Sequence, residues 1–172
     1  MSGRLADVFG IIEELKVARV IDDYAIGGAM AVLFYAEPLR TYDLDVFVFL
    51  PAPPAGLVTL TPLYAWLKER GFEPDAEHVL IHGVPVQFLP VYNPLVEEGV
   101  RAAQALEYDE GTVVRVVRPE YLVALAVQTG GRKRREHVAR LLEVEGFDQA
   151  RLVDILTRHA LIDIWMREWS QP

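Results

Sequence analysis

The stretch from residue 24 to residue 50 constrains the fold of this chain most, because it joins a glycine turn to two closely spaced acids. A short apolar run (24–26) stops at Gly27 and Gly28, and residues 29–36 then have the composition of a helix. The segment 43–50 is β-branched and aromatic, which is typical of a buried strand. The order strand, glycine turn, helix, strand predicts a sheet organised around this segment.

Two acids begin the second predicted strand. Asp43 and Asp45 are two positions apart, so their side chains are expected to point to the same face. Carboxylates held side by side on an apolar strand repel each other unless a cation or solvent compensates. Oxygen ligands of this kind suit Mg²⁺ or Mn²⁺. The pair therefore predicts a metal site, and Thr41 is expected on the same face as a hydrogen-bond donor to phosphate or metal-bound water.

The glycine pair predicts an anion site beside the metal site. A glycine turn that runs into a helix N-terminus presents free N–H groups and the positive end of the helix dipole. Gly27 and Gly28 alone have a simpler explanation as a tight turn, and an Asp-x-Asp strand alone is equally ambiguous. Together, in this order, they match what a nucleotide polyphosphate with a divalent cation requires.

The glycine turn at 27–29 and the segment 40–45, which contains the acid pair, resemble the signature of the DNA polymerase β-type nucleotidyltransferase superfamily. The chain is most similar to small members related to the abortive-infection (AbiEii-like) toxin nucleotidyltransferases. The resemblance is specific over residues 24–50 and looser as far as about Glu143. It implies a fold and a reaction class, and it identifies no substrate.

The resemblance also implies roles for individual residues. Asp43 and Asp45 are expected to bind Mg²⁺ or Mn²⁺ and to be catalytic. The residues expected to contact the nucleotide phosphates are Gly27, Gly28, Arg40, Thr41 and Lys133. Lys133 belongs to the basic run 132–135 that follows Gly130 and Gly131, for which a solvated charged face is the competing explanation. Arg40 has a pairing with Glu37 as its alternative.

The superfamily usually has a third carboxylate on a later strand, and the matching position in the predicted strand 84–89 is Gln87. An amide oxygen can ligate a metal, but it brings no charge and cannot act as a general base. A second metal is therefore doubtful. Glu73, Asp75 and Glu77 are alternative sources of a third acid, and a degenerate or repurposed site is the other interpretation.

The 172 residues suffice for one domain with its own core and a small helical extension. The patterns predict an α/β (α+β) fold, with a mixed sheet flanked by helices over 1–118 and a helical region, 119–172, packed on it; a single compact domain is the alternative. The absence of cysteine, of a signal peptide and of a membrane-spanning run favours a cytoplasmic protein. The net charge of −8 disfavours an extended duplex-DNA partner.

We therefore expect transfer of a nucleoside monophosphate from an NTP to a hydroxyl or phosphate acceptor, with Mg²⁺ as cofactor. A tRNA end, a protein side chain and a small molecule all stay open as acceptors. The abortive-infection resemblance implies an antitoxin partner. The alternative is a catalytically inactive protein of the same fold that binds a nucleotide or a protein partner, and Gln87 supports it.

Overall fold

The computed structural model describes residues 2–36, 41, 43–52 and 58–169. The strands are β1 (Asp23–Ile26), β2 (Leu44–Phe49), β3 (Pro74–Asp75), β4 (His78–Ile81), β5 (Val84–Pro90), β6 (Gln104–Asp109) and β7 (Thr112–Val116). The helices are α1 (Ser2–Val17), α2 (Gly28–Val32), α3 (Thr61–Glu69), α4 (Pro94–Arg101), α5 (Pro119–Thr129), α6 (Arg132–Leu142), α7 (Gln149–Arg158) and α8 (Ile162–Ile164), followed by a π-helical turn, η1 (Trp165–Trp169).

The strands of the described residues form one seven-stranded sheet in the order β3-β4-β5-β2-β1-β7-β6. β2 lies at the centre of the sheet. It runs parallel to β5 on one side and antiparallel to β1 on the other. β1 in turn runs parallel to β7, whereas β4/β5 and β6/β7 are antiparallel hairpins. The mixed sheet flanked by helices confirms the predicted α/β fold class.

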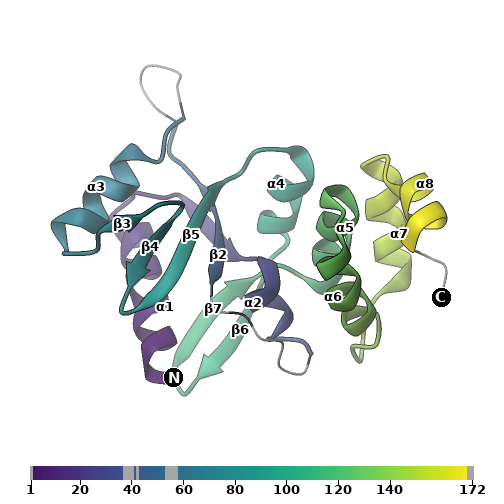
Figure 1. The fold of residues 1–172 in the computed structure, drawn as a ribbon, viewed down its shortest axis with the longest axis horizontal. Coiled ribbons are helices and arrows are strands. Elements are labelled where there is room, and N and C mark those ends of the chain that lie inside the picture. Colours follow the sequence, from purple (N-terminus) through teal and green to yellow (C-terminus); the bar gives the residue numbers. More distant parts are fainter. Residues whose placement is uncertain (1, 37–40, 42, 53–57, 170–172) are drawn as a thin grey trace.

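The two faces of β2 have different surroundings. Leu44, Val46 and Val48 are fully buried on one face. On that side α1 packs against β5, β6 and β7, and Tyr24 of β1 bonds to Glu13 of α1. Asp45 and Phe47 point to the other face, toward α2. Figure 1 shows α2, α4 and the C-terminal helices on this right-hand side of the sheet.

Several predicted elements differ from the observed ones in extent. The helix predicted over 29–36 is the short α2, and the helix predicted from 94 to 105 ends at Arg101 because Gln104 already begins β6. The third C-terminal helix, predicted to run unbroken from 148 to 169, breaks after Arg158, where Ala160 has a φ of 55°. None of the helices in the described ranges is both long and apolar enough to cross a membrane.

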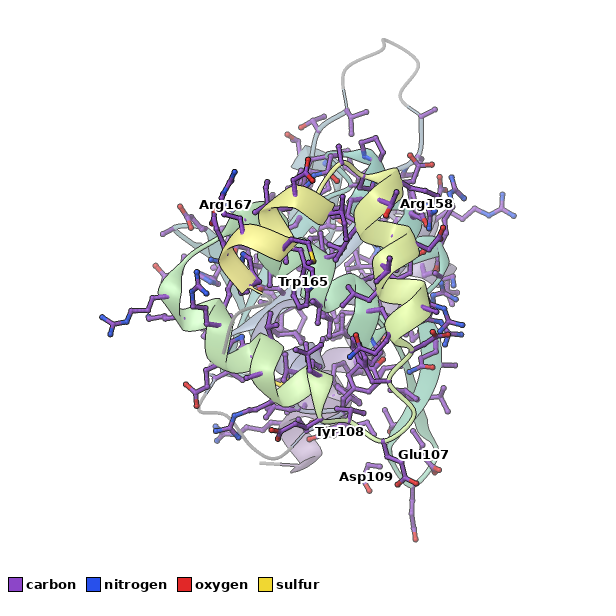
Figure 2. All side chains as sticks on the ribbon, turned by 90° about the vertical axis from the view of Figure 1, so that its right-hand side faces the viewer. Glu107, Tyr108, Asp109, Arg158, Trp165 and Arg167 are labelled. Carbon is purple, nitrogen blue, oxygen red and sulfur yellow. The ribbon has the colours of Figure 1, made fainter. Side chains whose placement is uncertain are left out.

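The C-terminal helices begin at Pro119, which matches the start of the predicted helical region, although the domain boundary itself stays a prediction. α5 packs against α2 and α4 as well as against α6 and α7. Figure 2 views these helices from outside, with Trp165 among them and Arg167 at the surface. Trp169 is buried at their end, and the guanidinium of Arg135 lies 4.8 Å from the centre of its ring.

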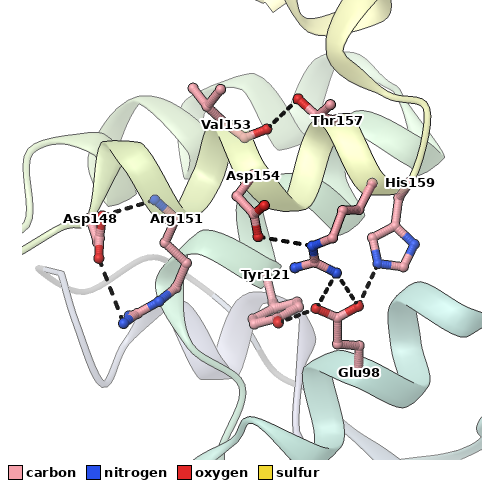
Figure 3. Close-up of polar contacts among 9 residues, drawn as sticks. Glu98, Tyr121, Asp148, Arg151, Val153, Asp154, Thr157 and His159 are labelled. Atoms are coloured by element: carbon pink, nitrogen blue, oxygen red, sulfur yellow. Dashed lines mark hydrogen bonds and ion pairs between the residues drawn. The ribbon is translucent and has the colours of Figure 1, made fainter.

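One carboxylate joins α4 to α5 and α7 (Figure 3). Glu98 accepts a hydrogen bond of 2.6 Å from the Tyr121 hydroxyl and one of 2.7 Å from Arg158 Nη1. The Nε2 atom of His159 also lies 2.7 Å from Glu98 Oε2. These donors, first among them Arg158, lower the pKa of Glu98 from 4.5 to about 2 against the opposing effect of burial.

Replacing Glu98 by Gln is expected to lower the free energy of unfolding at neutral pH by about 1 kcal/mol, because charge-assisted hydrogen bonds in a partly exposed cluster are lost. The folded-state pKa of Glu98 is lowered, so the unfolded chain binds more protons in acid. The contribution is therefore complete above about pH 4.5 and disappears as the pH falls toward about 2.

Urea unfolding of wild type and Glu98→Gln at pH 7, 4.5 and 3 measures this difference. Glu97→Gln is the matched control on the same helix, because Glu97 makes only an exposed pair with Arg101 and its removal should cost less than about 0.5 kcal/mol. A difference between wild type and Glu98→Gln that stays constant with pH contradicts the assignment.

Candidate functional site

The glycine turn and the acid pair meet at the end of β1. Gly27 lies opposite Asp45 across the β1/β2 pair, where its N–H donates a 2.9 Å hydrogen bond to the Asp45 carbonyl. A Cβ on Gly28 would lie 2.0 Å from Asp45 Oδ2, and one on Gly27 would lie 2.3 Å from the Phe47 ring. Gly28 also has a φ of 58°, which L side chains rarely adopt. Both positions therefore require glycine, and the turn faces the acids.

The two acids occupy different environments at the same edge of the sheet. Asp43 is exposed just before β2, and Thr41 Oγ1 donates a 3.1 Å hydrogen bond to its Oδ1. Asp45 is partly buried, and no hydrogen bond or ion pair among the described residues engages its carboxylate. Burial, followed by the charge of Asp43, raises the pKa of Asp45, while His78 and Arg134 act in the opposite direction. Neither carboxylate therefore has a direct cationic partner among the described residues.

A cleft of about 950 Å³ opens over this pair, between β2 and the helices α5 and α6. Its walls come from the glycine turn, the acid strand, the end of β5 and the two helices. The residues that line it are Gly28, Ala29, Val32, Thr41, Asp43, Asp45, Phe47, Leu89, Tyr92, Leu122, Leu125, Ala126, Thr129, Lys133, Arg134, Glu136, His137, Arg140 and Leu141. Sites for small molecules typically have volumes of a few hundred to about 1,000 Å³.

The basic run at the start of α6 divides between two roles. Lys133 and Arg134 line the cleft, and the charge of Arg134 reaches Asp45. Arg134 also donates a 3.0 Å hydrogen bond to the Gly130 carbonyl, which holds it beside the preceding turn. Arg135 instead lies over the Trp169 ring and bonds to the Glu168 carbonyl. Lys133 and Arg134 therefore face the acid pair from the other side of the cleft.

Gln87 occupies the predicted third position. It pairs directly with Asp45 in the parallel β2/β5 register, so the two side chains share a face on strands about 5 Å apart. Continuing the β4/β5 register places His78 opposite Gln87 on the other side. The three polar residues thus form a row across neighbouring strands, beginning at the acid pair.

The alternative sources of a third acid are not in the cleft. Asp75 lies on β3, which β4 and β5 separate from β2, while Glu73 is exposed and 3.8 Å from Lys68. Glu77 is exposed in the turn before β4. Among the described residues no group of three or more His, Cys, Asp or Glu side chains is placed to hold a metal ion. The structure therefore does not support the alternative that one of these acids replaces the missing carboxylate.

Sequence reasoning missed several residues of the cleft. Arg134 is the neighbour of Lys133 in the basic run. His137 and Arg140 follow Lys133 by four and seven positions, so the 3.6-residue period of α6 could have indicated them. Tyr92 gave no signal, because it follows β5 and reaches the cleft only through the parallel pairing of β5 with β2. Arg40, which was expected at the phosphates, lies outside the described residues.

Two solved structures share this architecture. An antigenic nucleotidyltransferase-like protein from Paracoccidioides brasiliensis superposes with a TM-score of 0.62 at 17% identity, over 96% of this chain and 89% of that chain. The antibiotic-resistance factor ANT(2'')-Ia superposes with a TM-score of 0.53 at 16% identity, over 95% of this chain and 97% of that chain. The chain therefore has a nucleotidyltransferase-like fold. At these identities the likeness shows the fold alone.

No protein-family model and no curated protein sequence matches the chain.

Proposed function

We propose that this protein is a nucleotidyltransferase that moves a nucleoside monophosphate from an NTP to a hydroxyl or phosphate acceptor, with Mg²⁺ or Mn²⁺. One observation carries the proposal: the carboxylates of Asp43 and Asp45 and the cations of α6 line opposite sides of one cleft. A polyphosphate with a divalent cation complements both sides, since the cation meets the acids and the phosphate oxygens meet Lys133 and Arg134.

The acid pair fits a divalent cation. Asp45 has no hydrogen-bond or ion-pair partner for its carboxylate among the described residues, and burial, followed by the charge of Asp43, raises its pKa. Asp43 and Asp45 would hold the cation, which would supply positive charge to the nucleotide phosphates. Two carboxylates and the neutral Gln87 offer less charge than three carboxylates. We therefore expect weak binding of the cation alone and tighter binding with the NTP, whose phosphates add oxygen ligands.

The remaining groups position the reactants. The absence of a Cβ at Gly28 lets the Asp45 carboxylate lie against the glycine turn, and Thr41 holds the Asp43 carboxylate by its 3.1 Å hydrogen bond. An acceptor oxygen then bonds to the α-phosphorus as the bond from that phosphorus to pyrophosphate breaks and pyrophosphate leaves with the electron pair. Lys133 and Arg134 would stabilise the departing charge. The acceptor proton goes to solvent, because Gln87 cannot accept it.

The proposal also covers the acceptor, the partner protein and the cellular location. A tRNA end, a protein side chain and a small molecule each provide a suitable oxygen. The resemblance to abortive-infection toxins favours the first two acceptors and adds an antitoxin as partner. We propose a cytoplasmic location for a reaction of this kind, because it consumes NTPs.

A second function, binding without catalysis, is favoured by Gln87. Its amide stands directly opposite Asp45, where the superfamily usually carries an acid, and no third acid of the described residues joins the pair. A protein of this kind would bind a nucleotide or a protein partner and transfer nothing.

Calorimetric titration with Mn²⁺, with and without a non-hydrolysable NTP, tests the proposal. We expect weak Mn²⁺ binding alone and clearly tighter binding with nucleotide, followed by transfer of label from an α-labelled NTP. Lys133→Ala should weaken nucleotide binding about tenfold, since a charge-assisted phosphate contact is lost. Arg167→Ala, which removes an exposed cation from η1, should change it less than about twofold.

The outcomes separate the candidate functions. Nucleotide binding without transfer to any acceptor supports the non-catalytic function. A wild-type protein that binds neither Mn²⁺ nor nucleotide contradicts the nucleotide site altogether. Equal losses in Lys133→Ala and Arg167→Ala would mean that the basic run is only a solvated charged surface.

A further inference from the structure

The cleft has two chemically distinct ends. The charged end holds the acid pair and the cations of α6, as described above. The other end is apolar, because Phe47 follows Asp45 on the same face of β2 and Leu89 lies opposite Phe47 in the β5 register. Leu122 and Leu125 of α5 add to the apolar lining of the cleft. A ligand that fills the whole cleft must therefore be anionic at one end and apolar at the other.

Tyr92 stands at the apolar end with its ring uncovered. It lines the cleft, yet 59% of its surface is exposed, and its ring centre lies 6.5 Å from that of Phe47 at an interplanar angle of 53°. A large aromatic side chain left open beside an apolar wall is a stacking surface.

The backbone of Tyr92 is held in place by the next residue. Asn93 caps α4 by accepting a 2.9 Å hydrogen bond from Val96 N, and its amide donates a 2.8 Å hydrogen bond to Gln128 of α5. Tyr92 is thus anchored between β5 and α4, whereas its ring has room for a partner. Because the position of Tyr92 is fixed before a ligand binds, stacking on its ring costs the protein little conformational entropy.

The spacing between the two ends suits a nucleotide. Side chains two positions apart on a strand are about 7 Å apart, which is the step from Asp45 to Phe47. Tyr92 lies one ring contact beyond Phe47. A nucleotide whose phosphates lie at the acids would therefore place its sugar over Phe47 and its base near Tyr92.

We propose that the nucleobase of the bound NTP stacks on Tyr92, in the apolar end of the cleft formed with Phe47 and Leu89. This inference rests on the proposed function and names the part of the substrate that this end receives. Phe47 and Leu89 beside Tyr92 are apolar, so they offer the base surfaces to pack against and no hydrogen-bonding side chains to read its edges. Adenine and cytosine nucleotides should depend on Tyr92 alike.

Titrations of Tyr92→Ala and Tyr92→Phe with two ligands in the presence of Mn²⁺ test this inference. One ligand is a non-hydrolysable ATP or CTP analogue, and the other is tripolyphosphate, which has the phosphates without the base. Tyr92→Ala should weaken binding of both analogues about five- to hundredfold and leave tripolyphosphate within twofold of wild type. Tyr92→Phe keeps the ring and should bind all ligands within about twofold of wild type, and thermal unfolding verifies that each variant folds.

Each other outcome has a definite meaning. Equal weakening of the analogues and tripolyphosphate by Tyr92→Ala overturns the inference, because Tyr92 would then only support the fold. Unchanged binding of the analogues also overturns it, and a raised KM for the acceptor would assign the apolar end to that substrate. Absence of binding of every ligand to wild type contradicts the proposed function itself.

Discussion

Gly28→Ala is expected to weaken nucleotide binding strongly in the presence of Mn²⁺ while the protein still folds. The new Cβ would lie 2.0 Å from Asp45 Oδ2, a separation that real contacts do not show, so either the carboxylate or the turn must move. Either movement alters the arrangement of the glycine turn and the acid pair, where the phosphates and the cation are proposed to bind. Ala at a φ of 58° adds backbone strain of about 1–2 kcal/mol to the free energy of folding. We expect nucleotide affinity to fall at least tenfold.

Gly111→Ala is the matched control for this prediction. Gly111 has a φ of 80° in the turn between β6 and β7, and a Cβ there meets no atom within 4 Å. It should lower the unfolding temperature to a similar degree and leave nucleotide binding unchanged. If Gly28→Ala binds nucleotide as wild type does, the close approach of Gly28 to Asp45 has no role in the site.

The sequence predicted the centre of the fold well, because that region is dominated by local signals. Apolar runs interrupted by glycine predicted β1, α2 and β2 in the right order, and the hairpin signal at residues 82–83 predicted β4 and β5. The parallel pairing of β5 with β2 then brought Gln87 opposite Asp45. These features follow from β propensity, turn chemistry and the period of two along a strand, all of which can be recognised in short segments.

The missed elements have weak local signals. β6 alternates between partly buried and exposed residues at the sheet edge and contains Leu106 and Glu107, so its composition also suits a helix. Only pairing with β7 makes it a strand. Likewise, the apolar stripe of the last helical region continues across the break at Ala160. The helix ends in a cap in which Leu161 N–H donates a 2.7 Å hydrogen bond to the Leu156 carbonyl and Ala160 has a positive φ. Glycine usually occupies such a position, so the alanine gave no sequence signal for the break.

The residue pattern indicated candidate site residues only where they are close in sequence, whereas Lys133 and Gln87 were named from the family resemblance. Asp43 and Asp45 share a face by their spacing, and the glycine turn precedes them by less than twenty residues. Arg134 and Tyr92 instead enter the cleft from α6 and from the end of β5, positions that only the assembled sheet and helices bring near the acids. Asp75 stayed open as a third acid for the same reason, because the sequence does not show that β4 and β5 lie between its strand and β2.

Gln87→Glu is expected to raise the affinity for Mn²⁺ without nucleotide about tenfold or more. Gln87 pairs directly with Asp45, so a carboxylate there would stand beside the existing pair and give three acids on one face. The same charge should destabilise the metal-free protein by up to about 1 kcal/mol, because like charges directly opposite in a sheet repel each other. Saturating Mn²⁺ should reverse this loss, since the cation binds only the folded state.

Calorimetric titration separates a local effect of the third acid from a general effect of negative charge. The proteins compared are wild type, Gln87→Glu, Gln87→Asp, Asp43→Asn and Leu80→Glu. Leu80 is exposed on β4 and pairs with Pro85, so Leu80→Glu adds a charge near the site but outside the row that contains Asp45. It should change Mn²⁺ affinity less than about twofold, and Asp43→Asn should abolish binding of both Mn²⁺ and nucleotide. A gain of label transfer in Gln87→Glu would mean that the missing carboxylate limits catalysis in this chain. If wild type binds neither ligand and Gln87→Glu restores neither, the cleft is no nucleotidyltransferase site, and binding of a protein partner becomes the function that the fold supports.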